Sequence, residues 1–395
     1  MLSALEADRT RVAVLAAQNQ DLKNSIATLR LEQARVQQEM VLAQQRLESY
    51  TYPVLTLPTE IVAEIFTRVF PVYPRCPPLT GVLSPTSLTH ICRLWREIAI
   101  STPVLWRAVA LEYGPDQQQV HIIDLWLKRS GSFPLSINVA IDSNDGGGAS
   151  KALSSVTAHH SRWEYLKLVY DASDLPAIEG SMPMLRHLHL ELIEFEVNPV
   201  SFREVPLLRS AVLNDVAASL IVLPWAQLTS LGLKRVFLHE CAPILKQTPN
   251  LVHCELHLFF AEYDHTDITL TYLESLALNN PDPLGPVHQY LAPFATPALR
   301  SLRIPELFLG PDPIRSLTAF ISKSGCKLQD VRITGKRSVH MNSYREALPS
   351  AGRLSFYRHY NNWGDHDRHV AIAQLDSDSD SDSGSTVRTD SEEVD

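Results

Sequence analysis

Hydrophobic residues recur every seven positions along the first 50 residues. The first position of this repeat, written a, falls on Leu5 and each seventh residue after it, and the fourth, written d, falls on Asp8 and each seventh residue after it. Five of seven a positions and six of seven d positions are apolar, and no Gly or Pro precedes Pro53. A seam this narrow predicts one long helix, residues 1–50, that packs on a partner helix as a coiled coil.

The residue types in this seam also bear on the partner. Val or Ile at a with Leu at d favours a parallel coiled coil of two helices, and Asn19 at an a position would fix the register of the two helices at some cost in stability. A homodimer through the N-terminal helix is one outcome of this pattern. The alternative is a surface helix that docks on its own domain.

A short helical pattern begins in LPTEIVAEIF, near the start of residues 53–106. Pro58 suits the first helical position, where a missing N–H costs nothing, and Glu60 in the first turn complements the helix dipole. Pro71 ends the pattern. We expect this helix to carry its apolar residues on one face, at Ile61, Val62, Ile65, Phe66 and Val69.

A second helix is expected after the proline-rich stretch between Phe70 and Ser84. Ser84 and Pro85 look like its cap and first position, and Pro103 begins a further short turn in STPVLW. The apolar stripe of this second helix would be Leu88, Ile91, Cys92, Trp95, Ile98 and Ala99.

Residues 107–365 contain a repeat in which apolar residues occupy the first, fourth and sixth positions. Successive copies start 20 to 29 residues apart. This spacing is typical of leucine-rich repeats, in which each unit adds one strand to a curved solenoid. The eight copies are WEYLKL from 163, LRHLHL from 185, LRSAVL from 208, LTSLGL from 228, LVHCEL from 251, LESLAL from 273, LRSLRI from 299 and LQDVRI from 328.

These repeats predict an α/β solenoid with irregular helices, because the asparagine usual after the third apolar residue is mostly missing. FPLSINVAI, residues 133–141, alternates and is a candidate for an earlier strand. The residues between the apolar positions would form one surface suited to recognising a target protein, or simply a solvated face. Candidates on that surface are His187, His189, Lys234, His253, Glu255, His257, Arg303 and Arg332.

The charge of the chain is concentrated at its end. Of the net charge of −9, residues 376–395 carry −7, from eight acidic residues and one arginine, which leaves −2 for the rest. Neither nucleic acid nor a membrane is therefore expected as a partner. The tail, residues 371–395, should be disordered. Its serines Ser377, Ser379 and Ser391 suit acidophilic kinases, although a purely solubilising tail is the alternative.

The remaining composition favours an intracellular protein. The five cysteines are scattered and form no C-x-x-C, no run of 18 apolar residues exists, and charged residues interrupt the first 20 positions. We expect a location in the cytoplasm, the nucleus or both, with the cysteines acting as small hydrophobic residues.

Little in the sequence indicates catalysis. His253, Glu255 and His257 in HCELH would project together from a strand and could ligate zinc, but the pattern differs from H-E-x-x-H, and exposed polar residues are the alternative. The glycines at 146–148 lack a following Gly-Lys-Ser/Thr, so they predict a loop rather than a phosphate site. We expect no enzyme, no cofactor and no metal.

The segment 53–106 resembles the F-box, through LPTEIVAEIF, then ICRLWREIA, then STPVLW. Together with the N-terminal helix and degenerate repeats, the layout is similar to F-box proteins abundant in fungi. The family's modules dock on a Skp-type adaptor and so join a cullin ubiquitin ligase. The resemblance implies that adaptor contacts come from Leu57, Pro58, Ile61, Val62, Ile65, Phe66, Leu88, Ile91, Cys92 and Trp95.

The expected function is thus a substrate-recognition subunit of a Skp–cullin–F-box ligase. The stretch from Phe70 to Ser84 is longer than the family's usual connection. Two alternatives remain open. The segment 53–106 could be a cap that seals the solenoid, and the chain could be a coiled-coil and repeat scaffold without a ligase.

Overall fold

The computed structural model describes most of the chain, namely residues 2–49, 53–112, 117–140, 148–170, 180–193, 200–202, 204–259, 267–279, 289–349 and 351–357. The expected acidic tail, 371–395, lies outside the described residues, as do the last residues, 358–365, of the expected repeat domain.

The chain forms two compact units. The first comprises Met1–Phe70 and Ser87–Thr102, and the second comprises Pro71–Thr86 and Pro103–Asp395. The expected helical module at 53–106 is therefore divided, because its proline-rich stretch and its last residues cluster with the second unit.

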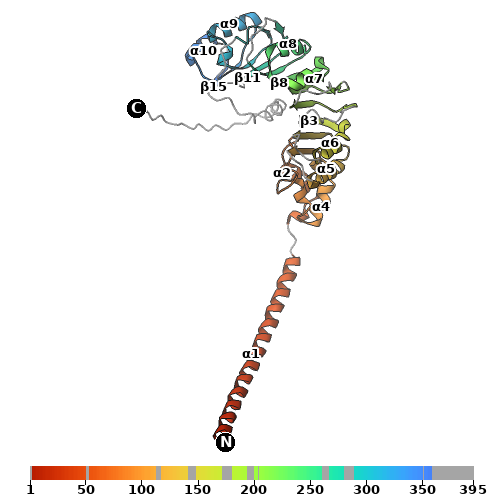
Figure 1. Cartoon of the computed structure of the whole chain (residues 1–395), viewed down its shortest axis with the longest axis vertical. Helices are drawn as coiled ribbons and strands as arrows, with labels where there is room; N and C mark the ends of the chain where they lie inside the picture. The colour runs from red at the N-terminus through yellow and green to blue at the C-terminus, as the bar shows by residue number, and fades with distance from the viewer. Residues whose placement is uncertain are drawn as a thin grey trace, which may run out of the picture. The chain divides into compact units, whose positions relative to one another are not determined.

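The first unit begins with a single long helix, α1 (Leu2–Ser49), in which no residue is buried. At 1.5 Å per residue it is about 70 Å long. Figure 1 shows it as an uninterrupted rod. The heptad pattern thus forms a helix over the expected residues. None of the helices in the described part of the chain is both long and apolar enough to cross a bilayer.

The rest of the first unit is helical but differs in detail from the expectation. The turn η1 (Pro53–Thr56) leads to α2 (Thr59–Val69), and Pro58 caps this helix from outside instead of filling its first position. The expected second helix is two pieces, α3 (Pro85–Leu88) and α4 (Arg93–Ile100). The break occurs because Cys92 adopts an extended backbone and its sulfur accepts a hydrogen bond from the Trp95 N–H at 3.4 Å.

The second unit is built on an 11-stranded parallel sheet. Its strand order follows the chain, so that each strand pairs only with the strands before and after it in the stack. The strands are β1 (Ala108–Glu112), β2 (Leu135–Ala140), β3 (Trp163–Tyr170), β4 (His187–Leu192), β6 (Ser210–Asn214), β8 (Ser230–Val236), β9 (His253–Leu258), β11 (Ser275–Asn279), β13 (Ser301–Pro305), β14 (Asp330–Thr334) and β15 (Arg353–Tyr357).

Each of the eight repeated strings forms one strand of this sheet, and residues 133–141 supply β2. The three apolar positions of each string point into one core. In the repeat from 251, for example, Leu251, Cys254 and Leu256 are all buried. Two strands of the 11-stranded sheet were not expected, β1 and β15, although Trp106, Val109 and Leu111 fit the same spacing and are buried. Two small sheets, β5 (Val200–Ser201) with β7 (Ile221–Val222) and β10 (Ile268–Thr269) with β12 (Phe294–Ala295), complete the unit.

Short helices connect the strands and cover one side of the sheet. Figure 1 shows α8, α9 and α10 on the outer side of the curve formed by β8, β11 and β15. Both ends of α9 are capped. The Asp312 carboxylate accepts the Arg315 N–H at 3.1 Å, and the left-handed Gly325 ends the helix. The helices are α5 (Gln117–Arg129), α6 (Gly148–Thr157), α7 (Asp215–Leu220), α8 (Leu238–Lys246), α9 (Pro313–Ser324) and α10 (Met341–Ala347), with single turns η2 (Pro103–Trp106), η3 (His160–Arg162), η5 (Trp225–Gln227) and η6 (Glu306–Phe308).

Burial alternates along the strands, as in β4 and β11, so the buried residues lie on the side of the sheet that the helices cover and the residues between them lie on the other side. We call this second side of the 11-stranded sheet the open face.

Candidate functional site

The helix α2 carries two adjacent apolar rows. Its first turn is held by the Pro58 carbonyl, which accepts the N–H groups of Ile61 and Val62 at 3.1 Å each. On the polar side, Arg68 Nε lies 2.8 Å from Glu64 Oε1. The apolar rows follow from the spacing of four residues, which brings side chains onto one face of a helix.

One of these rows is buried and the other is exposed. Val62 and Phe66 are each 1 % exposed, whereas Ile61 and Ile65 are 50 % and 43 % exposed. Val62 and Phe66 were both expected to contact an adaptor. They are instead buried inside the protein and cannot reach another molecule. The exposed row continues at both ends, through Leu57 and Val69.

The buried row packs on the second helical segment. The ring of Phe66 meets the indole of Trp95 edge-on, with 5.0 Å between centroids and 62° between planes. The start of α4 is fixed by the Cys92 cap, and Arg96 Nε donates to the Thr89 carbonyl at 2.6 Å. These contacts position Trp95 against α2 and leave Ile61 and Ile65 on the outside.

The other expected adaptor residues divide in the same way. Leu88 is buried, Cys92 and Trp95 are half-buried, and Ile91 and Pro58 are exposed. The exposed row of α2, with its continuation at both ends, is what we call the apolar face of the first unit. Its members are Leu57, Ile61, Ile65 and Val69.

The residues expected to contact a target all lie on strands of the sheet. Strand register places His189, Glu255, Arg303 and Arg332 at the same level of β4, β9, β13 and β14. The smaller Val212, Gly232 and Ala277 occupy that level on the strands between them. Since neighbouring strands are about 4.8 Å apart, these positions form one continuous row on the open face.

Three charged or ionisable side chains meet on this face between β4 and β8. Lys234 Nζ donates to Glu191 Oε1 at 2.6 Å, and His189 Nε2 lies 2.7 Å from the same oxygen. Hydrogen bonds from His189 and Lys234 hold the pKa of Glu191 well below its usual value. Burial lowers the pKa of His189, which keeps this imidazole neutral at pH 7. Sequence reasoning did not select Glu191, because its partner Lys234 is 43 residues away.

A second polar cluster lies on β9 and β11. Asn279 Nδ2 donates to Glu255 Oε1 at 2.7 Å, and His257 Nε2 lies 3.2 Å from the same oxygen. Farther along, Arg332 Nη2 lies 2.9 Å from Asp330 Oδ2. The row thus presents hydrogen-bonding groups of both charge signs in fixed positions.

The structure does not arrange His253, Glu255 and His257 of HCELH around a common point, as zinc ligands would be. Glu255 and His257 bond to each other and to Asn279, as above, while His253 lies two residues earlier on the strand and is exposed. Among the described residues, no group of three His, Cys, Asp or Glu side chains converges as a metal site.

The N-terminal end of the open face is covered by the proline-rich stretch, residues 71–86, which we call the strap. The Tyr73 hydroxyl donates to Glu164 Oε2 at 2.9 Å, and the Arg107 guanidinium lies 3.7 Å from the centre of its ring. Ser136 Oγ of β2 donates to the Pro74 carbonyl at 2.6 Å. This stretch therefore has a structural role in the second unit, since it packs on β2 and β3.

The part of the open face that lies under the strap ends at a stacked pair of rings, Tyr165 and His187. Tyr165 meets Tyr73 edge-on at 5.4 Å and on its other side stacks on His187, with 4.5 Å between centroids and 4° between planes. Burial, aided by Arg186, lowers the pKa of His187 to about 4. Beyond this pair, β4 and later strands carry the expected target residues.

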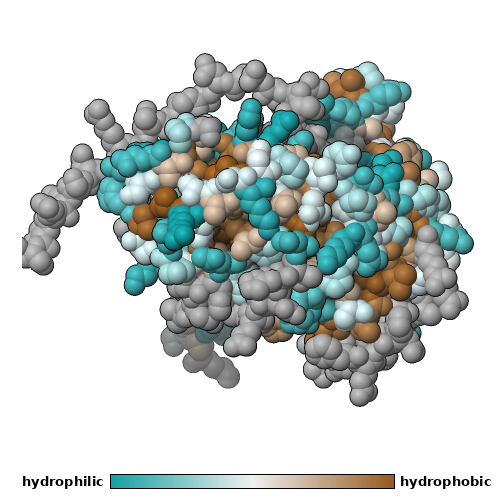
Figure 2. All heavy atoms as spheres, turned by 90° about the horizontal axis from the view of Figure 1, so that it is seen from above, coloured by the Kyte–Doolittle hydropathy of each residue, from teal (hydrophilic) through white to brown (hydrophobic). Residues whose placement is uncertain are grey.

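Figure 2 shows the surface seen from above, with hydrophilic side chains interspersed among smaller hydrophobic areas. Such a mixture differs from the apolar row on α2. Neither a scan against protein-family models nor a search of curated proteins finds a match for this chain.

Proposed function

We propose that this chain is the substrate-recognition subunit of a Skp–cullin–F-box ubiquitin ligase. In this proposal the first unit binds a Skp-type adaptor, and the second holds a target protein. The observation that carries the proposal is the exposed row of Ile61 and Ile65, which lies within the very motif, LPTEIVAEIF, that resembles the F-box.

An exposed apolar row on a short helix is unfavourable unless another molecule covers it. Fully burying an Ile side chain contributes roughly 1.5–3 kcal/mol, so covering the exposed half of Ile61 and of Ile65 would contribute about 1 kcal/mol each. Helix-in-groove docking is a common way to bury such a row. The apolar face of the first unit offers this row together with Leu57 and Val69.

The second unit supports target binding in this proposal. Its sequential parallel sheet, with repeats 20 to 29 residues apart, fits an irregular leucine-rich-repeat solenoid. The row of His189, Glu255, Arg303 and Arg332 would read the target through hydrogen bonds and charge complementarity. His187, His253 and His257 would surround that row, whereas Lys234 is buried and would hold Glu191 in place.

The mechanism is proximity rather than chemistry by this chain. Adaptor and target bind to one polypeptide, so the target stays at a high effective concentration near the transfer centre of the ligase. No side chain of this protein needs to act on a reacting bond.

Co-purification tests the proposal. The tagged full chain should capture the Skp-type adaptor and cullin of the same organism, and Ile61→Asp or Ile65→Asp should lose both. Ile193→Asp is a matched control, because Ile193 is a comparably exposed isoleucine (54 %) on the sheet unit. Retention of adaptor and cullin by folded Ile61→Asp and Ile65→Asp would reject the assignment. A wild-type chain that captures neither would instead favour a scaffold without a ligase.

A further inference from the structure

We propose that α1 pairs with α1 of a second copy of this chain, as a parallel, two-stranded coiled coil in exact register. The pairing concerns residues 2–49 and does not depend on the adaptor or on the proposed ligase.

The first support is that α1 exposes its whole seam. The helix has 48 residues, and none of them is buried. Leu22, Leu29 and Met40, all at a or d positions, are each more than 60 % exposed. An isolated helix with such a seam is marginal in water, and burying the seam against another helix supplies the missing stability.

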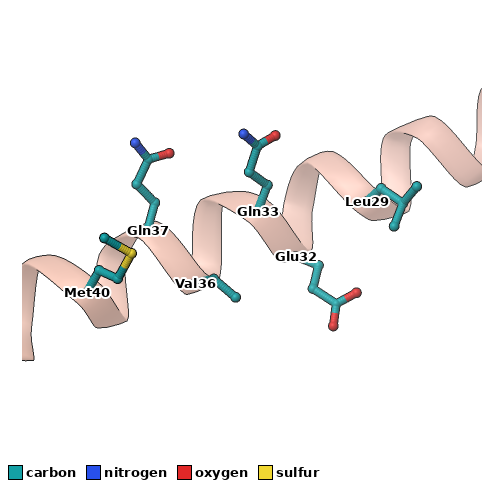
Figure 3. A pocket seen from close by; sticks show the side chains of 6 residues that line it. All are labelled: Leu29, Glu32, Gln33, Val36, Gln37 and Met40. Carbon is teal, nitrogen blue, oxygen red and sulfur yellow. The ribbon is translucent and has the colours of Figure 1, made fainter.

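The second support is the set of residues that would receive the knobs of a facing helix. In a coiled coil each knob enters a hole formed by four residues of the facing helix. A knob from an a position enters a hole formed by residues at d, g, a and d of the facing helix. A knob from a d position enters the next hole, which is formed by residues at a, d, e and a. Figure 3 shows six side chains of α1 that supply both holes, namely Leu29, Glu32, Gln33, Val36, Gln37 and Met40.

The polar residues within the seam select the register. Asn19 and Gln33 are the two polar a positions, and in a parallel pair without offset each faces its own copy, amide to amide. A shift of one heptad places both opposite apolar residues. A shift of two heptads pairs Asn19 with Gln33 once but leaves the remaining amide of each helix opposite a leucine.

An antiparallel pair is disfavoured by the same residues, because a positions then face d positions. Every d position from Leu15 to Ala43 is apolar, so Asn19 and Gln33 would lie against hydrocarbon in any extensive overlap. Two antiparallel alignments overlap most of the helix. Lys23 would lie beside Arg30 of the second copy in one of them and beside Lys23 of the second copy in the other, so like charges would meet in both.

The flanking charges agree with the parallel arrangement. There each g residue lies beside the e residue five positions later in the other copy. These pairs include Gln18 with Lys23 and Glu32 with Gln37, and none brings like charges together. Asp8, a d residue in the first complete heptad, faces its own copy and is the unfavourable pair of this arrangement.

The parallel direction has a functional consequence. Both copies of the chain after Ser49 leave the coil at the same end, so one assembly carries two sheet units and two apolar faces. Two linked binding units raise the apparent affinity for any target that offers two sites.

Cysteine cross-linking of the full chain tests this arrangement. Ala43→Cys at a d position should form a disulfide-linked dimer under mild oxidation, because it faces its own copy only in the in-register parallel pair. Ala27→Cys is the matched control, since it lies on the same exposed helix but away from the seam. The five native cysteines are the same in both variants. Equal cross-linking of the two variants would overturn the proposal.

Light scattering gives the second readout. The wild-type chain should have twice its mass of 44.2 kDa, and Leu22→Lys with Leu29→Lys should return it to a single mass. Because no residue of α1 is buried, this double variant should keep the circular-dichroism signal of the sheet unit. A wild-type chain of single mass, or of three times the mass, would contradict the two-stranded pair. Adaptor capture is measured separately on the double variant, so that failure of the coil and failure of the ligase proposal are distinguishable.

Discussion

Phe66 of α2 and Trp95 of α4 meet edge-on, with their ring centroids 5.0 Å apart. This contact belongs to the buried apolar row of α2, whereas the second apolar row is exposed to solvent. Phe66 is buried, while its chain neighbour Ile65 is 43 % exposed. Substitution of Phe66 should therefore mainly weaken folding, and substitution of Ile65 should mainly weaken binding.

Phe66→Ala should destabilise the protein by about 3–4 kcal/mol, because it removes a fully buried ring and leaves a cavity beside Trp95. Ile65→Ala is the neighbouring control and should change the free energy of unfolding by less than about 1 kcal/mol, since its side chain is largely exposed. Urea denaturation followed by circular dichroism measures both. Equal effects of the two substitutions would show that the Phe66–Trp95 contact contributes little to stability.

Tyr73→Phe should loosen the strap, because it removes the hydrogen bond from the hydroxyl to Glu164 Oε2. Hydrogen bonds to charged groups contribute about 1.5–3 kcal/mol, and the half-buried position of Tyr73 places the expected loss near 1 kcal/mol. Hydrogen exchange of the Arg75 and Ser84 amides within the strap should become faster. Tyr272→Phe, at an exposed tyrosine, is the control. Unchanged exchange in Tyr73→Phe would mean that the strap is held by its other contacts alone.

Lys234→Met should cost about 2 kcal/mol, because it leaves the Glu191 carboxylate, 26 % exposed, without its cation. Glu191→Gln combined with Lys234→Met should cost less than the sum of the single substitutions, by about 1–2 kcal/mol, since the double variant leaves neither charge unpaired. A double-mutant cycle in urea measures this coupling. Strictly additive costs would contradict a direct interaction between the two side chains.

The His187 ring should make stability depend on pH. Its pKa is about 6.5 in an unfolded chain and about 4 in the folded protein. Between these values the unfolded chain binds more protons, so the free energy of unfolding falls as the pH falls from 6.5 to 4. The fall due to this group is at most about 3 kcal/mol, because one pKa unit corresponds to about 1.4 kcal/mol.

His187→Phe keeps a ring stacked on Tyr165 but cannot be protonated. We therefore expect this variant to lose less stability than the wild type between pH 6.5 and 4. Thermal unfolding at a series of pH values compares the two proteins. Parallel pH profiles would exclude His187 as a source of the acid sensitivity.

Much of the second unit was predictable because each repeat carries its own signal. Leu251, Cys254 and Leu256 show the pattern within six residues, and the same pattern marks the other strands. The strands β1 and β15 carry it as well, in Trp106, Val109 and Leu111 and, with weaker burial, in Leu354 and Phe356. They were missed because they stand at the ends of the series.

The features that could not be predicted depend on contacts between distant residues. The helical spacing from Leu88 to Ala99 is unbroken in sequence, yet the Cys92 cap divides the helix. Tyr73 and Glu164 are 91 residues apart, so no local pattern predicts the strap. Likewise, apolar spacing identifies the stripe on α2 but not which of its two rows, Ile61 with Ile65 or Val62 with Phe66, the protein covers itself.

The most direct test of the central claim is the affinity of the purified Skp-type adaptor for the full chain, measured by isothermal titration calorimetry. Placing a charge on the exposed row of α2 should weaken binding at least about 100-fold in Ile61→Asp and in Ile65→Asp, since a loss of about 3 kcal/mol is expected for an unpaired charge in a docked apolar face. Ile193→Asp should bind as the wild type does. Equal affinity of all four proteins, or an adaptor that binds none of them, would contradict the account.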